Sequence, residues 1–344
     1  MKQGPTTRQD PRWVRKQSYA QWVASALKRA RTSQGSIYTL FDSSVPEPRE
    51  MLRSLIAGGV EPEFSAYFTS AFGDGNPYVL DMLANTYEVA AGQILCTTGA
   101  TGGMSLVYRA LTRPGDHILI ESPGFDLFAD LAESHGVEAE TFPRIGGTFA
   151  IDLDRIEALI RPETKLIVVS NLHNPSGMLI AHDVMLSLAA LAERRGILVA
   201  VDEVYGDYAD KAARPLAAVR LSPNFLSISS LTKIYGLGSL RCGWVVGAEP
   251  VIAQLRDVSA RVEFNVSTIS HAIGAHVLVN RAAFDAYSAK SVAETRPVFD
   301  RWFAELHADG LVDGALPEVG CICFPHFPTI PDTEAFSGWR ASRP

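Results

Sequence analysis

The sequence predicts an α/β fold organised around a mostly parallel sheet. Runs of mostly apolar residues, which are typical of strands buried on both faces, occupy residues 166–170, 197–201 and 225–228. Polar residues follow each run directly. From Asn174 to Asp202 is 28 positions and from Asp202 to Lys233 is 31, close to the roughly 30 residues of a βαβ unit. Right-handed crossovers should therefore return these three polar residues to one edge of the sheet.

The first part of the chain is expected to be mostly helical. Apolar side chains recur at helical spacing over residues 12–31, which predicts an amphipathic helix with a basic, solvated face. A short strand is expected at residues 37–40, followed by an extended link at residues 45–49, where two prolines disfavour helix. Further helices are expected near residues 51–57 and 78–87, the second opened by a Gly-Asn-Pro turn.

A strand, a turn of small residues and a helix follow one another at residues 94–111. The turn is Gly99-Ala100-Thr101-Gly102-Gly103. Small residues let backbone N–H groups approach an anion, and a helix N-terminus adds about half a positive charge. This layout fits a phosphate site, and the tight packing of a βα turn explains the glycines equally well. The pattern is not GxGxxG, so it does not indicate a dinucleotide.

The remaining elements alternate between strand-like and helix-like sequence. A further strand is expected at residues 117–121, before Ser122-Pro123-Gly124-Phe125. Helices are expected at residues 185–195, 251–258, 271–279 and 288–307.

The run at residues 225–228 breaks into hydroxyls, one lysine, glycines and one arginine. In an α/β sheet this order brings chemical groups to the crevice at the carboxyl ends of the strands. Lysine forms Schiff bases, as Lys233 can, while Ser230 and the forked guanidinium of Arg241 can hold phosphate. Together these groups indicate a phosphorylated aldehyde cofactor.

Composition and charge favour a small-molecule partner. A net charge of -7 and a pI near 5.7 give no electrostatic footprint for nucleic acid or an anionic membrane. No apolar run approaches the roughly 18 residues of a spanning helix, so no membrane association is expected. The four cysteines and eight histidines lack the spacing of a disulfide framework or a metal site. The basic first 36 residues lack the apolar core of a signal, and a reducing cytoplasm fits best.

Residues 230–244, Ser-Leu-Thr-Lys-Ile-Tyr-Gly-Leu-Gly-Ser-Leu-Arg-Cys-Gly-Trp, resemble the lysine signature of class I/II pyridoxal-phosphate aminotransferases. The resemblance covers roughly residues 36–325. It implies fold type I, which has a mostly parallel, seven-stranded sheet with helices on both faces and a small α+β domain made from both termini. The implied divisions are an N-terminal arm with part of the small domain at 1–46, a cofactor-binding domain at 47–265 and a small C-terminal domain at 266–344. Residues 319–324 resemble the first C-terminal strand of the family.

The resemblance also implies roles for residues around the cofactor ring. Lys233 would carry pyridoxal phosphate as a Schiff base and then act as general base and acid between the substrate α-carbon and the C4' atom of the cofactor. Asp202 matches the carboxylate that keeps the pyridine nitrogen protonated. Tyr205 and Asn174 would donate hydrogen bonds to the ring hydroxyl oxygen. Phe125 matches the aromatic side chain that stacks on the ring, although core packing also explains it.

A second set of residues is implied at the phosphate. The set is Gly99, Ala100, Thr101, Ser230, Arg241 and Tyr67. Family active sites lie at a two-fold interface, so a homodimer is implied, and Tyr67 would reach the phosphate of the second subunit. A packed aromatic is the alternative for Tyr67.

The expected function is transfer of an amino group between an amino acid and a 2-oxo acid. A lyase or decarboxylase of the same fold shares every residue named, and a non-catalytic cofactor-binding protein is a further alternative. The family's carboxylate-binding arginine lies beyond Pro344, where this sequence stops, and the family arginine in the helix at 78–87 is Leu80 here. Arg261 is one candidate for the missing carboxylate contact.

Overall fold

The computed structural model describes residues 19–32, 43–58, 62–208 and 215–331. The chain divides into two compact units, Met1–Asp42 and Ser43–Pro344. Within the first unit, helix α1 spans Tyr19–Thr32 and agrees with the helix expected over 12–31, whose beginning lies outside the described residues. The strand expected at 37–40 also lies outside them. The predicted division at residues 46 and 265 stays a prediction.

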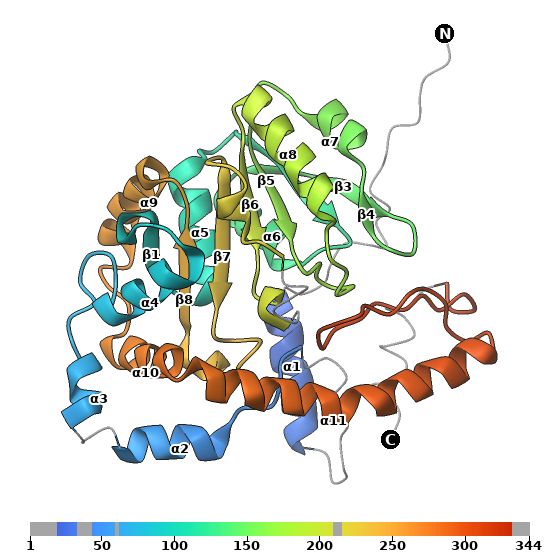
Figure 1. The fold of residues 1–344 in the computed structure, drawn as a ribbon. Coiled ribbons are helices and arrows are strands. Elements are labelled where there is room, and N and C mark those ends of the chain that lie inside the picture. Colours follow the sequence, from blue (N-terminus) through green and yellow to red (C-terminus); the bar gives the residue numbers. More distant parts are fainter. Residues whose placement is uncertain (1–18, 33–42, 59–61, 209–214, 332–344) are drawn as a thin grey trace. The chain divides into compact units, whose positions relative to one another are not determined.

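An eight-stranded sheet forms the centre of the second unit (Figure 1). Its strands, in spatial order, are β1 (Ile94–Thr98), β8 (Cys242–Val246), β7 (Phe225–Ser230), β6 (Leu198–Asp202), β5 (Thr164–Ser170), β2 (His117–Ser122), β3 (Glu138–Ile145) and β4 (Ala150–Ile151). The strands from β7 to β3 pair in parallel, and β8 runs antiparallel to both β1 and β7. The sheet is thus α/β and mostly parallel, as predicted. The eighth strand is a two-residue edge strand that pairs antiparallel with β3.

Helices cover both faces of the sheet. The helices of the second unit are α2 (Arg49–Ala57), α3 (Pro62–Tyr67), α4 (Pro77–Tyr87), α5 (Gly99–Leu111), α6 (Leu127–Ser134), α7 (Leu153–Leu159), α8 (His182–Arg195), α9 (Glu249–Val262), α10 (Thr268–Val279) and α11 (Arg281–Ala308). Of these, α5, α6 and α9 pack on one face of the sheet, and α7 and α8 pack on the other. Side chains of β5 alternate between two cores. Leu166 and Val168 pack with α5, α6 and α9, whereas Ile167 and Val169 pack with α7 and α8. Burial on both faces explains the apolar run of residues 166–169 in the middle of this strand.

The register of the central strands sets the position of the polar residues that follow them. Ser170 at the end of β5 lies opposite Asp202 at the end of β6, and Asp202 lies opposite Ile228 in β7. The carboxyl ends of these three adjacent strands therefore share one edge. The segments that carry Asn174, Asp202 and Lys233 leave the sheet at this edge, as the crossover spacing predicted.

The strand expected at residues 319–324 is wrong, because no strand forms there. Two features oppose it: Gly320 has a left-handed φ of 92°, and Pro325 has no N–H to donate. The described chain after α11 instead makes an isolated antiparallel bridge between Asp313 and His326. Within the described residues, no helix has the length and apolar character needed to cross a membrane.

Candidate active site

Lys233 lies in the loop between β7 and β8, at the carboxyl edge of the sheet. Its Nζ atom lies 2.8 Å from Ser43 Oγ and 5.7 Å from the centroid of the Tyr205 ring. The loop is closed by backbone hydrogen bonds from Leu231 N to Cys242 O and from Leu237 N to Leu231 O. The amine is thus held by a structured loop, and its neighbours come from distant parts of the chain.

Asp202 ends β6 and is almost fully buried, at 6% exposure. Its Oδ1 accepts a hydrogen bond from Val204 N at 3.1 Å. Burial raises the pKa of the Asp202 carboxyl to about 6, and the Val204 hydrogen bond and the positive charge of Lys233 oppose that rise. A buried carboxylate of this kind gains from a cationic partner, which the nitrogen of a protonated pyridine would supply.

The turn before α5 lies against the guanidinium of Arg241. Gly99 has a φ of +73°, and a Cβ atom built on it would collide with Arg241. Gly243 is equally constrained, because its Cβ would lie 2.6 Å from Gly99 Cα and 2.8 Å from Ala100 N. Arg241 Nη2 also lies 3.4 Å from Thr98 O. Because Gly99 and Gly243 have no side chains, the N-terminus of α5 can lie against the Arg241 guanidinium, and both groups attract anions.

Ser230 ends β7 on the same sheet face as Asp202. The register supports this placement, because Asp202 pairs with Ile228, two residues before Ser230. The Ser230 side chain is 3% exposed, and its hydroxyl accepts a hydrogen bond from Thr232 N at 3.4 Å. The hydroxyl thus lies at the start of the lysine loop, in the strand next to β8 and Arg241.

Tyr205 and Asn174 flank the same edge. Tyr205 is 1% exposed, and its ring stacks on that of Tyr208 with centroids 6.2 Å apart. Asn174 is half-buried, and its backbone N–H donates to Ser170 Oγ at 2.9 Å. Tyr208 therefore holds the Tyr205 ring in place, and Ser170 holds the backbone of Asn174.

Phe125, Tyr67 and Arg261 lie in ordinary packing or surface positions of this single chain. Phe125 packs edge-on against Phe128, with centroids 5.6 Å apart. The Tyr67 ring contacts Tyr78 and His276, at 5.0 and 6.0 Å between centroids. Arg261 is exposed in the last turn of α9. Their expected roles at a ring, a partner's phosphate and a substrate carboxylate stay predictions.

A buried ionic network under Asn174 was not predicted. Glu121, the end of the expected strand at 117–121, accepts hydrogen bonds from Ser170 N at 2.7 Å and from Ser170 Oγ, and lies 3.2 Å from Arg144 Nη1. Burial raises the pKa of Glu121 to about 8, against the lowering effect of Arg144 and Ser170. Only the pairing of β2 with β3 and β5 brings these groups together, and no local motif signals it.

Three further residues near Lys233 were also missed. Ser43 contacts the amine itself, and the Tyr208 hydroxyl donates to Lys233 O at 2.6 Å. The Cys321 thiol lies beside Tyr208, and burial raises its pKa while Tyr208 and Lys233 lower it. The 190 positions between Ser43 and Lys233 explain the omission, because nothing in a Ser-Ser pair points to a distant lysine.

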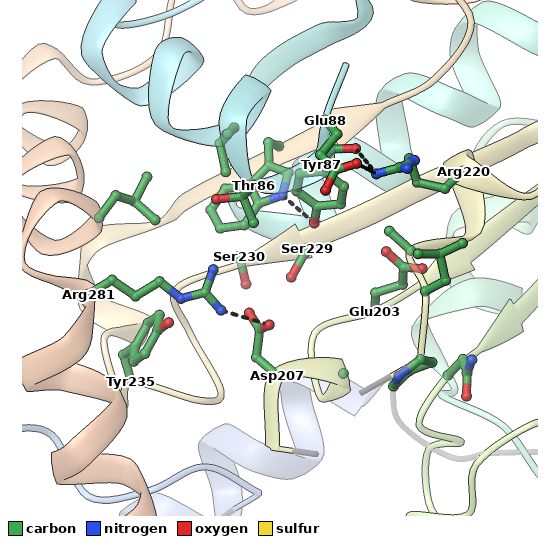
Figure 2. A pocket seen from close by; sticks show the side chains of 18 residues that line it. Thr86, Tyr87, Glu88, Glu203, Asp207, Arg220, Ser229, Ser230, Tyr235 and Arg281 are labelled. Carbon is green, nitrogen blue, oxygen red and sulfur yellow. Dashed lines mark hydrogen bonds and ion pairs between the residues drawn. The ribbon is translucent and has the colours of Figure 1, made fainter. Parts of the chain in front are cut away.

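A separate cavity of about 230 Å³ lies on the other face of the sheet (Figure 2). Glu203, Ser229 and Ser230 line it together with Trp244, which donates to Tyr87 at 2.9 Å. An ion pair between Arg281 and Asp207 at 2.9 Å lines its wall. Glu203, next to Asp202, and Ser230, at the end of β7, thus both border this second cavity.

The groups around Lys233 fit pyridoxal phosphate. Lys233 offers an amine to an aldehyde, Asp202 offers a buried carboxylate to a ring nitrogen, and the Arg241 guanidinium beside the bare Gly99 offers donors to a phosphate. Among the described residues, no group of three or more His, Cys, Asp or Glu side chains is arranged to hold a metal ion.

Residues 70–328 match the family model for aminotransferase class I and II, and the chain belongs to this family. Membership implies pyridoxal phosphate as the cofactor. The sequence is 29% identical over 212 residues to a histidinol-phosphate aminotransferase of Sinorhizobium fredii, covering 62% of this chain and 55% of that protein. It is 30% identical over 227 residues to a tyrosine aminotransferase of Mus musculus, covering 58% and 50%. The chain thus spans about half the length of these curated relatives.

The fold is also that of solved aminotransferases. Aspartate aminotransferase from Thermus thermophilus with maleate superposes with a TM-score of 0.78 at 20% identity, covering 89% of this chain and 81% of that one. A PLP-dependent aminotransferase from Streptococcus suis gives a TM-score of 0.78 at 24% identity, covering 92% and 84%. These similarities confirm the predicted fold class.

Proposed function

We propose that this chain is a pyridoxal-phosphate-dependent aminotransferase that moves an amino group between an amino acid and a 2-oxo acid. The observation that carries the proposal is the meeting of the Lys233 amine and the buried Asp202 carboxylate at one sheet edge, where Arg241 lies against Gly99. The family and the relatives named histidinol-phosphate and tyrosine aminotransferase support it.

Pyridoxal phosphate supplies an aldehyde carbon for bonding to amines and a ring that accepts electrons when its nitrogen is protonated. Lys233 would hold the cofactor covalently. Once an incoming amine displaces it, Lys233 would take a proton from the substrate α-carbon and deliver it to the aldehyde carbon of the cofactor, a contribution worth roughly 100- to 10,000-fold in rate. Asp202 would keep the ring nitrogen protonated, because a buried anion stabilises a cation beside it.

The phosphate would be held from two directions. Arg241 would donate a forked pair of hydrogen bonds, and the N–H groups of Ala100 and Thr101 would donate from the first turn of α5. The Ser230 hydroxyl would add a neutral donor. Gly99 contributes by having no side chain, since a Cβ there would collide with Arg241.

The ring and its hydroxyl oxygen would be positioned by Asn174, Tyr205 and Phe125. Tyr205 is almost fully buried and three residues beyond Asp202, and Asn174 is tied to the sheet through Ser170. Hydrogen bonds from both to a ring oxygen would stabilise its negative charge. Phe125 would then cover one face of the ring.

We also propose that the protein is a homodimer. The rings of Phe72 and Phe264 contact each other with centroids 5.4 Å apart, yet these side chains are 65% and 73% exposed. Neighbouring apolar side chains, Phe68 and Ile269, are also more than half exposed. A contacting pair of exposed aromatic side chains, with further exposed apolar residues close by in the sequence, fits an interface. In a dimer, Tyr67 would reach the phosphate of the second subunit.

A cytoplasmic location is part of the same proposal. All four cysteines are free thiols, and Cys96 and Cys242 are buried. Unpaired buried thiols fit a reducing compartment.

Product analysis tests the proposed reaction. Protein loaded with pyridoxal phosphate is mixed with a panel of amino acids in the absence of a 2-oxo acid. The proposal predicts one equivalent of 2-oxo acid and one of pyridoxamine phosphate per site. Free ammonia or carbon dioxide with regeneration of the starting cofactor would contradict transamination and favour a lyase or a decarboxylase.

A further inference from the structure

The Lys233 amine forms a hydrogen bond with a serine 190 positions earlier in the chain. Nζ lies 2.8 Å from the Oγ atom of Ser43, the first residue of the second compact unit. Both side chains are half-buried. The hydroxyl is therefore close enough for a full hydrogen bond to the atom that performs the proposed chemistry.

A clamp of hydrogen bonds, made by the Tyr208 hydroxyl and the backbone of Val45 and Lys233, fixes Ser43 beside the lysine loop. The Tyr208 hydroxyl donates to Lys233 O at 2.6 Å and accepts from Val45 N at 3.2 Å. Val45 N also lies 3.3 Å from Lys233 O. Two residues after Ser43, the main chain is thus tied to the main chain of Lys233 itself. The position of Ser43 follows from this clamp.

Close packing on the opposite side of the loop reinforces the clamp. Gly236 has a left-handed φ of 66°, and its Cβ would lie 2.5 Å from Pro46 O and 2.6 Å from Val45 O. Only glycine permits this approach. The Tyr287 hydroxyl donates to Pro46 O at 2.9 Å, so α11 holds the same segment from outside.

A hydroxyl suits an amine that must change its protonation state. It accepts a hydrogen bond from an ammonium group and donates one to a neutral amine, so it holds both forms. The Asp202 carboxyl and the Cys321 thiol interact electrostatically with Lys233, and the Tyr205 ring lies within cation–π range. A carboxylate in place of Ser43 would favour the ammonium form alone.

We propose that Ser43 is a positioning residue for Lys233. Its hydroxyl holds the ε-amine in place whenever that amine is not bonded to the cofactor, and so keeps it within reach of the proton it transfers. The role in proton transfer rests on the proposed function. The hydrogen bond between Ser43 and Lys233 does not, because the chain forms it without a cofactor. Neither the amine nor the hydroxyl is consumed, because Nζ gives up to the aldehyde carbon of the cofactor the proton that it accepts from the substrate α-carbon.

The first test uses protein without cofactor. The protein is labelled with a small amount of an amine reagent, and the peptide of residues 221–241, which contains Lys233, is quantified by mass spectrometry. Ser43→Ala should raise the labelling rate of Lys233 several-fold, because the amine is no longer held. Ser43→Thr, which keeps the hydroxyl, should restore the wild-type rate. Exposed Lys165 and Lys290 serve as internal references, and Ser44→Ala is the matched control.

The second test uses the loaded protein in a single half-reaction with an α-deuterated amino acid. Ser43→Ala should slow this step about 10- to 100-fold and increase the primary isotope effect, while the affinity for pyridoxal phosphate stays unchanged. Ser43→Thr should recover most of the rate. A slower step with a larger isotope effect and unchanged cofactor affinity is expected if Lys233 is no longer held in place for proton transfer. A general loss of stability would not give this combination.

The outcomes separate the inference from the proposed function. Equal labelling of Lys233 in Ser43→Ala and Ser44→Ala would show that the hydroxyl does not hold the amine. Increased labelling with an unchanged isotope effect would show that the contact has no part in proton transfer, which also overturns the proposal. Wild-type protein that forms no covalent bond to pyridoxal phosphate would instead refute the proposed function, and the labelling test would still judge the contact.

Discussion

The guanidinium of Arg241 occupies the space that any side chain at Gly99 would need. The two residues face each other because β1 and β8 pair antiparallel, with Thr98 opposite Cys242. The left-handed φ of Gly99, +73°, turns the chain from β1 directly into α5. One glycine thus lets a helix N-terminus and an arginine converge on the same point, where we place the phosphate.

Gly99→Ala should weaken the affinity for pyridoxal phosphate by about tenfold or more, because the new Cβ displaces Arg241. The left-handed backbone should also cost about 1 to 2 kcal/mol of stability. Gly115→Ala is the matched control, since Gly115 has a φ of +92° but open space around its Cβ. Cofactor titrations followed by absorbance, with urea unfolding of both variants, separate the two effects. Equal cofactor affinities in the two variants would contradict the phosphate site.

Asp202→Asn should leave most of the cofactor affinity intact and lower turnover roughly 100- to 1000-fold, because a neutral amide does not stabilise a protonated ring nitrogen. Glu203→Gln is the control, since Glu203 is the adjacent carboxyl but faces the cavity on the opposite side of the sheet. Turnover is measured at saturating substrate. Near-normal turnover of Asp202→Asn would show that Asp202 is not needed to keep the ring nitrogen protonated.

Glu121 should make stability depend on pH. Burial raises its pKa in the folded protein to about 8, above the ordinary value of 4.5. Between these values the folded state binds more protons than the unfolded state, so this group loses stabilising effect as pH rises from 4.5 to 8. Glu121→Gln lacks the titration. We therefore expect the stability of the wild type, relative to this variant, to fall across that window.

Urea unfolding at intervals from pH 4.5 to 8 measures the difference between the two proteins. Burial lowers the pKa of the neighbouring His173 to about 4. The contribution of His173 to folding stability therefore rises with pH up to about 6.5. Comparison of variant and wild type at each pH removes this opposing effect. Parallel stability profiles would contradict a raised pKa for Glu121.

Phe264→Asp should dissociate the proposed dimer. Burying a charge in place of an aromatic side chain at an interface costs at least about 2 kcal/mol, which weakens association by roughly 30-fold. Leu186→Asp is the control, because Leu186 is an exposed apolar residue on α8, away from the Phe72–Phe264 pair. Sedimentation equilibrium reports the mass. A wild type that is monomeric at all concentrations would refute the dimer.

The sequence predicted the parts of the molecule that depend on local pattern and crossover geometry. Apolar runs identified β5, β6 and β7, and the spacing of about 30 residues placed Asp202 and Lys233 at one edge. Their surroundings could not be predicted in the same way. The contact between Ser43 and Lys233 and the burial of Glu121 against Arg144 depend on pairing between distant segments.

Local signals also misled at residues 319–324. The run Val-Gly-Cys-Ile-Cys-Phe has the composition of a strand, yet Gly320 adopts a left-handed conformation and the segment does not pair as a strand. Strand propensity acts only where a neighbouring edge is available. In the described residues after α11, the one bridge lies outside this run, between Asp313 and His326.

The most direct test of the account asks which lysine holds the cofactor. The protein is reconstituted with pyridoxal phosphate, reduced with borohydride, digested and mapped by mass spectrometry. We predict one pyridoxyl group per chain, attached to Lys233 in the peptide of residues 221–241, and none in Lys233→Ala. Modification of any other lysine in place of Lys233, or a protein that binds no pyridoxal phosphate, would contradict the account.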